Sequence, residues 1–175
     1  DIINLEENHG KGNALAIGIE EARDGMLVFV DADMINLTKH HIYCLIEPLL
    51  SDRADMVLGY PPFRSHAREL VFGYFKWLTG ERALWRKDIL PLVDAFRYAG
   101  YGVEAIINHA MRQRRVHLFE LNGLFHVLKF DRWSLPISAQ KYLREGMEIA
   151  GTMLPVYYRG IKDGIINRFH PSSMN

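Results

Sequence analysis

Residues 8–34, NHGKGNALAIGIEEARDGMLVFVDADM, set the architecture of this chain. They open with a glycine-rich loop, and apolar residues then recur at helical spacing over 14–23. The continuous apolar run 26–30 that follows is typical of a buried strand. We also expect a strand over the apolar residues 1–5. Strand, loop, helix and strand would then form a βαβ unit whose two strands are parallel.

Helical and extended patterns continue to alternate along the rest of the chain. Further helices are expected over 39–50 with Thr38 as N-cap, 65–78, 87–98, 103–113 and 138–150. A strand is expected over 54–60, and a short strand or turn over 81–86. The segments 115–121 and 123–130 flank an Asn-Gly pair, which predicts a hairpin. This alternation, without repeats or linkers, predicts one α/β domain.

Composition limits the classes of function that fit the chain. Its 175 residues suffice for one ordinary domain, and 49% hydrophobic with 24% charged residues is a globular composition. The formal net charge is zero, which disfavours nucleic acid as a partner. The single Cys44 excludes an internal disulfide and favours a reducing compartment. Because the sequence has neither an apolar run of about 18–20 residues nor a signal-peptide pattern, we expect a soluble, cytoplasmic protein.

Two aspartates follow the apolar run 26–30 and are the first candidates for a functional site. Side chains two residues apart on a strand point to the same side, so Asp31 and Asp33 converge if extended geometry continues past Val30. They would then lie at the carboxyl edge of a parallel sheet, where such sheets bind ligands. Close carboxylates repel unless a cation lies between them, and Mg²⁺ or Mn²⁺ holding a diphosphate fits this chemistry. The alternative is that one aspartate caps the next helix and the other is solvated.

Four sequence segments occur along the chain in an order that indicates a known family. The loop Asn8-His9-Gly10-Lys11-Gly12 precedes a helix and a strand that ends in Asp-Ala-Asp, and ADMVLGY, LTGERALWRKDIL and GYGVEAIINHAMRQ follow. In this order the chain resembles nucleotide-sugar glycosyltransferases of the GT-A fold and the large family two type. The most similar branch contains glucosyl-3-phosphoglycerate synthases and polyprenyl-phosphate sugar transferases, and the likeness covers residues 1–130. It implies a Rossmann-like, mixed and mainly parallel sheet flanked by helices.

By this resemblance, the donor nucleotide sugar binds around the Asp-Ala-Asp segment. Asp31 would contact the ribose or sugar, Asp33 would ligate the Mg²⁺ or Mn²⁺ ion on the donor diphosphate and act in catalysis, and Ala32 lies between them in the donor site. Lys11 and Gly12 would lie near phosphate or sugar at a helix N-terminus, where amide donors favour anions. The loop matches neither the P-loop nor the dinucleotide-binding pattern. A solvated loop lysine is the alternative for Lys11.

The resemblance also assigns an acceptor side. Thr79 and Gly80 would form a turn that faces the acceptor, with Glu81 and Arg82 either beneath it as a charge pair or in direct contact. Ordinary loop chemistry is the alternative for this turn. Glu104, at a helix start behind two glycines, would act as a catalytic base or bind acceptor hydroxyls. The helix dipole stabilises an acid at that position whatever its role.

Other polar residues admit two interpretations each. By the resemblance, His126 would be a further metal ligand. The alternative is that His126 is an ordinary core histidine. Four arginines are candidates for binding a phosphorylated acceptor such as phosphoglycerate or a polyprenyl phosphate, with solvated helix faces as the alternative: Arg64, Arg68, Arg82 and Arg86. His40, His41 and Cys44 have no second pair at zinc-site spacing, which disfavours a zinc site.

The sequence also departs from the family pattern. Relatives begin with strands ending near Pro-x-x-Asn-Glu and in Val-Asp-Asp-x-Ser, and neither motif is present, so we expect an N-terminal nucleotide-binding part of roughly 70 residues to be missing or supplied by another chain. Residues 1–135 are then a partial GT-A domain. Residues 136–175 are a helical extension that packs on the domain or on a second subunit of a homo-oligomer. An apolar stripe and basic residues in this tail would also suit peripheral membrane contact.

The leading hypothesis is a metal-dependent glycosyltransferase that moves a sugar from a nucleoside-diphosphate donor to a hydroxyl or phosphate acceptor. The acceptor would be a small phosphorylated molecule or a polyprenyl phosphate. A nucleotidyltransferase on a related fold also places carboxylates and Mg²⁺ at a strand end, and it remains an alternative. The third hypothesis is a non-catalytic module that uses this fold for binding or assembly. Donor hydrolysis that depends on Asp33 would separate the enzyme from the module.

Overall fold

The computed structural model describes residues 2–23, 25–62 and 73–126; Arg64, Arg68, the predicted helix 138–150 and the extension 136–175 lie outside this range. The helices are α1 (Lys11–Glu21), α2 (Lys39–Leu50), α4 (Arg86–Ile89), α5 (Val93–Arg97) and α6 (Val103–Ala110), with 3₁₀ turns η1 (Gly73–Leu78), η2 (Leu90–Leu92) and η3 (Gly100–Gly102). The strands are β1 (Met26–Phe29), β2 (Met34–Ile35), β3 (Met56–Tyr60), β4 (Arg82–Trp85), β5 (Val116–Glu120) and β6 (Phe125–His126). Within the described ranges, no helix has the length and apolar character needed to cross a membrane.

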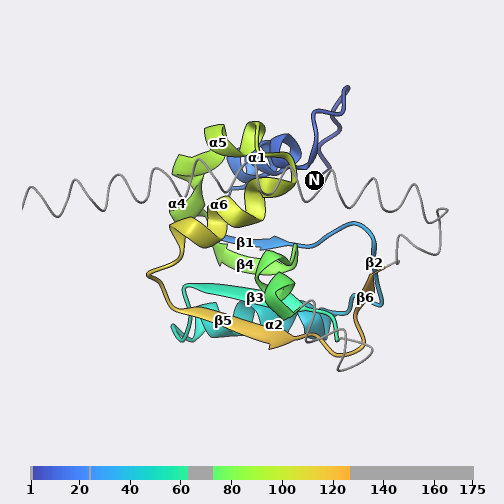
Figure 1. The fold of residues 1–175 in the computed structure, drawn as a ribbon, viewed down its shortest axis with the longest axis vertical. Helices are drawn as coiled ribbons and strands as arrows, with labels where there is room; N and C mark the ends of the chain where they lie inside the picture. Colours follow the sequence, from blue (N-terminus) through green and yellow to red (C-terminus); the bar gives the residue numbers. More distant parts are fainter. Residues whose placement is uncertain (1, 24, 63–72, 127–175) are drawn as a thin grey trace, which may run out of the picture.

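Four strands form the central sheet in the order β1-β4-β3-β5, and β2 and β6 form a separate two-stranded ladder (Figure 1). β4 pairs antiparallel with both β1 and β3, whereas β3 and β5 are parallel. β1, β3 and β5 therefore run in one direction, and only β4 runs against them. The sheet is mixed, as predicted, but two of its three ladders are antiparallel and only one is parallel. Because three of its four strands point the same way, their carboxyl ends lie at the same edge.

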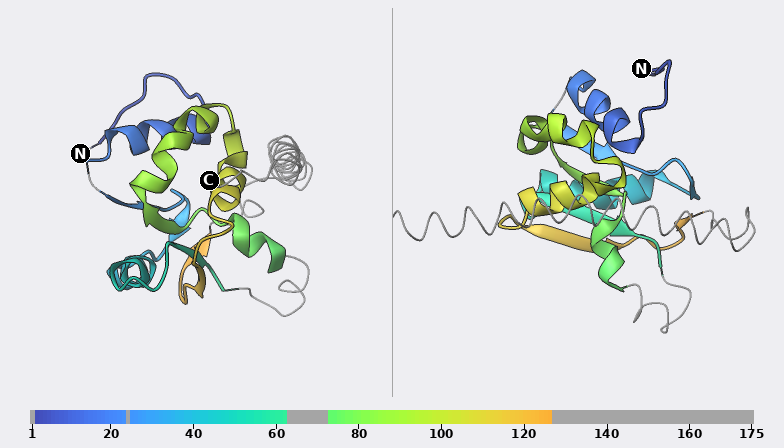
Figure 2. Two further views of the ribbon diagram at one scale, coloured as in Figure 1. Left: turned by 90° about the vertical axis from the view of Figure 1, so that its left-hand side faces the viewer. Right: turned by 45° about the horizontal axis from the view of Figure 1, so that its top comes forward.

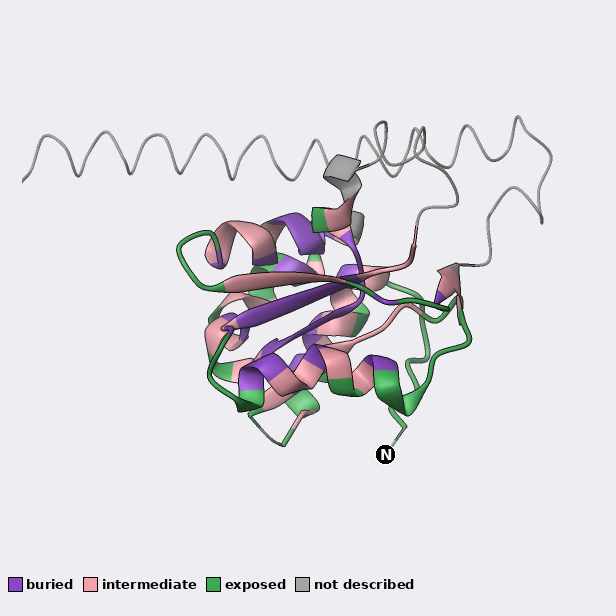
Figure 3. Cartoon of the chain, turned by 90° about the horizontal axis from the view of Figure 1, so that it is seen from below, coloured by how far each residue is buried: buried purple, intermediate pink, exposed green. Residues whose placement is uncertain are grey.

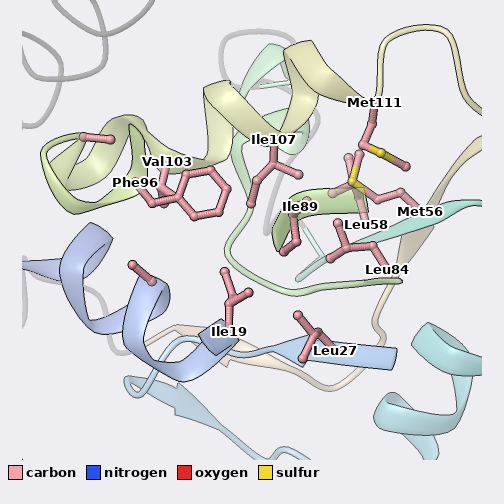
Figure 4. Packing of buried hydrophobic residues seen from close by; sticks show 12 residues of the cluster. Ile19, Leu27, Met56, Leu58, Leu84, Ile89, Phe96, Val103, Ile107 and Met111 are labelled. Carbon is pink, nitrogen blue, oxygen red and sulfur yellow. The ribbon is translucent and has the colours of Figure 1, made fainter. Parts of the chain in front are cut away.

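Helices cover both faces of the sheet, and alternate residues of each strand fill two separate cores. α1, α5 and α6 pack on one face, where α1 and α5 lie side by side, and α2 packs on the other (Figures 1 and 2). Met56 and Leu58 of β3 belong to the first core, and Val57 between them belongs to the second. Ile19 and Phe96 close the first core from the helices (Figure 4). The central strands β3 and β4 are the most buried part of the sheet (Figure 3).

Local sequence signals predicted the start of α2 correctly but did not predict every helix. Thr38 caps α2 as expected, because its side chain accepts a hydrogen bond from the His41 amide. The predicted single helix over 87–98 is wrong: the chain forms α4, η2 and α5 there, since Pro91 has no N–H to donate and interrupts the helical ladder. The described end of the predicted helix 65–78 is the 3₁₀ turn η1.

The predicted strand over 1–5 is wrong for the residues that the structure describes. Residues 2–5 form no strand, and their apolar side chains are exposed, 89% in the case of Ile2. The predicted parallel pairing with 26–30 is therefore also absent, and β1 instead pairs antiparallel with β4. An apolar run forms a strand only where a partner offers it a ladder, and none of the described strands does so for 2–5.

The predicted hairpin over 115–130 is also wrong. β5 pairs in parallel with β3, from Met56 opposite Val116 to Tyr60 opposite Glu120. A turn then follows, in which the Leu124 amide donates to the Leu121 carbonyl, and β6 leaves to pair with β2. The Asn-Gly pair does form a turn, but the turn signal does not determine which strand the next segment joins.

Candidate functional site

The candidate site lies at the carboxyl end of β1, beside the start of β4. The antiparallel register pairs Phe29, the last residue of β1, with Arg82, the first residue of β4. Asp31, two residues after β1, therefore lies against Gly80, two residues before β4. The N-termini of α1 and α6 reach the same place, because Lys11 and Glu104 meet there.

Lys11 bridges two carboxylates. Its Nζ lies 2.7 Å from Oδ1 of Asp31 and 2.6 Å from Oε1 of Glu104. Burial alone would lower the pKa of Lys11, but attraction to Glu104 and then to Asp31, with hydrogen bonds to both, raises this pKa above its ordinary 10.5. At neutral pH Lys11 is therefore a cation held between two anions.

Among the described residues, only one of the two carboxylate oxygens of Glu104 has a partner. Oε1 contacts Lys11, whereas Oε2 is buried and has no hydrogen-bond partner among the described residues. Glu104 lies in the first turn of α6, where the helix dipole stabilises a negative charge. A buried oxygen without a partner costs about 1–3 kcal/mol. A donor on a bound molecule would remove that cost, so Oε2 is a candidate ligand contact.

The turn before β4 is buried, and its polar groups contact one another. The Thr79 hydroxyl lies 2.6 Å from the Gly59 carbonyl oxygen and 2.6 Å from Oε2 of Glu81, and it can donate to one of them at a time. Oε1 of Glu81 accepts a hydrogen bond of 3.3 Å from the Asp31 amide. Glu81 thus ties the turn before β4 to the residue that follows β1.

Arg82 lies beneath this turn. Its guanidinium donates to the Thr79 carbonyl oxygen and, over 3.3 Å, to Oδ1 of Asn108. Burial lowers the pKa of Arg82 to about 10, with Glu104, Glu81 and Asp31 opposing the shift, so the guanidinium stays charged at neutral pH. Glu81 and Arg82 are 0% and 1% exposed, so both side chains lie beneath the turn.

Replacing Gly80 by alanine is expected to displace Asp31. A Cβ at position 80 would lie 2.4 Å from Cγ, Oδ1 and Oδ2 of Asp31, so the carboxylate must leave Lys11. We expect a loss of about 1–3 kcal/mol in the free energy of unfolding, measured by urea titration. Asp31→Ala removes the colliding group, so Gly80→Ala should cost much less in that background. Equal costs in both backgrounds would contradict this packing.

The two aspartates do not share one side of a strand, so the expected extended geometry past Val30 is wrong. The Met34 amide donates to the Asp31 carbonyl over 3.3 Å, which closes a turn over residues 31–34. Asp31 points to Lys11, whereas Ala32 and Asp33, the central residues of the turn, are exposed.

The predicted metal ligands come from segments that the structure brings together. Met34 pairs with His126 in the β2–β6 ladder, so the backbone of His126 lies beside the residue that follows Asp33. Among the side chains that the structure describes, no group of three or more from His, Cys, Asp and Glu is close enough to hold a metal ion.

Several residues singled out in the sequence have structural contacts. Gly12 packs against α5, where a Cβ would lie 2.1 Å from the Phe96 carbonyl oxygen. Arg86 donates to the carbonyl oxygens of Ile19 and Glu20 at the end of α1. Arg86 therefore holds α1 on the sheet and does not lie with the proposed acceptor residues.

Asn108 was not singled out from the sequence, and His41 was named only in the disfavoured zinc set. Asn108 connects Arg82 to the Trp77 carbonyl oxygen, and its spacing of four residues from Glu104 on α6 could have indicated it. His41 is buried, and both of its ring nitrogens are used, by the Thr38 amide and the Asn122 carbonyl oxygen. These contacts give His41 a structural role.

Comparison with known proteins identifies a family and a fold. The sequence matches the model of glycosyl transferase family 2 over residues 1–112. No curated protein matches the chain significantly. Glucosyl-3-phosphoglycerate synthase from Mycobacterium tuberculosis, in complex with Mn²⁺, UDP-glucose and glycerol 3-phosphate, is similar in structure, with a TM-score of 0.60 and 21% identity over 83% of this chain and 54% of that chain. The same enzyme in complex with Mg²⁺ and UDP gives a TM-score of 0.61 and 20% identity, over 83% of this chain and 54% of that chain.

A third crystal structure, described as a mycobacterial protein, gives a TM-score of 0.57 and 22% identity over 87% of this chain and 52% of that chain. At such identities the likeness shows the fold, and the chain spans about half the length of these solved proteins. The mixed sheet, its flanking helices and the family match over residues 1–112 agree. The chain belongs to glycosyl transferase family 2 and has the GT-A fold of that family.

Proposed function

We propose that this chain carries part of the active site of a metal-dependent glycosyltransferase, which transfers a sugar from a nucleoside diphosphate to a hydroxyl or phosphate acceptor. The observation that carries the proposal is the convergence of Asp31, Lys11 and Glu104 at the carboxyl edge of the sheet. Open α/β sheets bind ligands at this edge. Membership of glycosyl transferase family 2 supports the reaction type. The similar solved enzyme is described in complex with UDP-glucose and Mn²⁺, which supports the donor class.

The residues beside the turn 31–34 fit a divalent metal. Asp33 offers an exposed carboxylate there, and the β2–β6 ladder brings the backbone of His126 beside it. Carboxylate oxygen suits Mg²⁺ and Mn²⁺, and imidazole suits the latter better. We assign Asp33 and His126 as the residues that would hold the ion. When bound, the ion would neutralise charge on the leaving nucleoside diphosphate.

The rest of the chemistry belongs to the charged residues around Lys11. Lys11 would hold Asp31 toward the donor and Glu104 toward the acceptor, so the two substrates meet over one rigid cluster. Oε2 of Glu104, buried and without a described partner, would accept a hydrogen bond from the acceptor hydroxyl. The Thr79-Gly80 turn would line the same space with Gly80 against Asp31.

A small phosphorylated acceptor is the better supported of the two predicted classes. The similar solved enzyme is described in complexes with glycerol 3-phosphate and with phosphoglyceric acid. A polyprenyl phosphate carries the same anionic group on a longer apolar body, so it is the competing substrate in an assay. Transfer to phosphoglycerate but not to a short-chain polyprenyl phosphate would support our choice.

Asp33→Ala is expected to abolish metal-dependent donor binding. Calorimetry would measure the affinity of the chain for Mn²⁺ alone, and for UDP-glucose and GDP-mannose with and without Mn²⁺. We expect at least ~100-fold weaker Mn²⁺ binding in the variant, because even outer-shell partners of metal ligands contribute about 10–100-fold. Asp94→Ala, which removes an exposed carboxylate from α5, is the matched control and should bind as the parent does. Mn²⁺ affinity that is unchanged in Asp33→Ala would refute the metal assignment.

A further inference from the structure

The β2–β6 ladder is too short to be stable by itself. Within the described residues it consists of two residue pairs, Met34 with His126 and Ile35 with Phe125, and it stands apart from the central sheet (Figure 1). An isolated two-stranded ladder is marginally stable even at greater length. Asp33 directly precedes this ladder, so whatever fixes the ladder also fixes the two proposed metal ligands.

His41 makes a polar bridge next to the ladder. It is 5% exposed and is the third residue of α2. The Thr38 amide donates to Nδ1 over 3.2 Å, and Nε2 lies 2.9 Å from the Asn122 carbonyl oxygen. A backbone amide can only donate and a carbonyl oxygen can only accept. His41 is therefore the neutral tautomer with its proton on Nε2, and it donates to Asn122.

The His41 bridge links the two strands of the ladder through the segments next to them. α2 follows β2 through the residues before Thr38, and Asn122 lies in the turn that leads into β6. The hydrogen bond from His41 to Asn122 thus joins the segment after one strand of the ladder to the segment before the other. The pairing of β2 with β6 and the bridge at His41 constrain each other.

Apolar packing also contributes to this region. Leu121 and Leu124, on either side of Asn122 and Gly123, are buried in the second core with Met34 packed against it. Such packing is not directional, so it anchors the turn without fixing how far β6 slides along β2. The His41 hydrogen bond supplies a specific distance and direction.

We propose that His41 is a positioning residue that holds β6 in register with β2 and thereby sets the separation of Asp33 and His126. The metal part of this inference rests on the proposed function, whereas the register part does not. His41 touches neither substrate nor metal in this arrangement. It acts through Asn122, as outer-shell partners of metal ligands do.

The test compares three variants of matched chemistry. In His41→Asn, the side-chain oxygen can replace Nδ1 as acceptor for the Thr38 amide, but the side chain is too short to reach Asn122. In His41→Gln, the longer amide can reach Asn122 and should restore the bridge. Thr38→Ala removes the other half of the helix cap and leaves His41 bonded to Asn122, at a cost of about 1 kcal/mol in stability. Each variant is measured for Mn²⁺ affinity by calorimetry and for amide hydrogen exchange at residues 34–35 and 125–126.

We expect His41→Asn to speed exchange at those of these amides that donate across the ladder, and to weaken Mn²⁺ binding by about tenfold. His41→Gln should recover both, and Thr38→Ala should lower the melting temperature without changing either. Exchange in His41→Asn that equals the parent's would overturn the proposal, as would equal losses in Thr38→Ala. If Asp33→Ala retains Mn²⁺ affinity, the metal assignment fails instead, and the exchange measurement still decides whether His41 holds the register.

Discussion

Replacing Lys11 by methionine is expected to lower the free energy of unfolding by about 3 kcal/mol, because it leaves two buried or half-buried carboxylates without their shared cation. Methionine retains the apolar stem of the side chain, so the loss reports the ammonium group. Glu104 bears most of the cost: its side chain is 8% exposed, and its second oxygen already has no partner among the described residues. Urea unfolding of the parent and the variant measures the difference.

Two comparisons test the cause of this loss. Lys39→Met removes an exposed lysine at the start of α2 and should change stability by no more than about 0.5 kcal/mol. Because its carboxylate partners raise the pKa of Lys11 above 10.5, its contribution is complete below pH 10.5 and is lost as the pH rises through the raised pKa. From neutral pH upward, the difference in unfolding free energy between the parent and Lys11→Met should therefore narrow only above pH 10.5. A gap already closed near pH 8 would contradict the ion-pair explanation.

The contacts of Lys11 show what a local sequence pattern cannot predict. The glycine-flanked lysine before a helix indicated a site, and the structure places this lysine between two carboxylates. Its partners are Asp31, 20 residues away, and the still more distant Glu104, which comes within reach because η3, just before α6, packs against α1. A local pattern therefore singled out Lys11 but could not predict that its ammonium group holds two carboxylates.

The same limit explains the errors in strand pairing. Thr38 and the residues after it predicted α2 because a helix cap is local, within four residues. The partner of Phe125-His126 is β2, far away in sequence, and an Asn-Gly turn suggests the nearer strand instead. Asp31 and Asp33 were expected on one side because alternation assumes a continued strand, and the turn at 31–34 removes that assumption. The periodicity of apolar residues predicts helices and strands, whereas tertiary contacts determine which strands pair with each other.

Gly12→Ala is expected to be among the most destabilising single changes in the chain, at about 3 kcal/mol, for a reason unrelated to ligand binding. Its Cβ would lie 2.1 Å from the Phe96 carbonyl oxygen and 3.2 Å from the Gly100 amide nitrogen, and backbone atoms cannot move aside as a flexible side chain can. α1 must then separate from α5, and Lys11 would move with the start of α1. The matched control is Gly18→Ala in the same helix, where a Cβ has no atom within 4 Å and should stabilise the helix by about 0.5–1 kcal/mol. Urea midpoints that shift in opposite directions would confirm that close approach of α5 requires glycine at position 12, and equal midpoints would show that α1 is not packed as described.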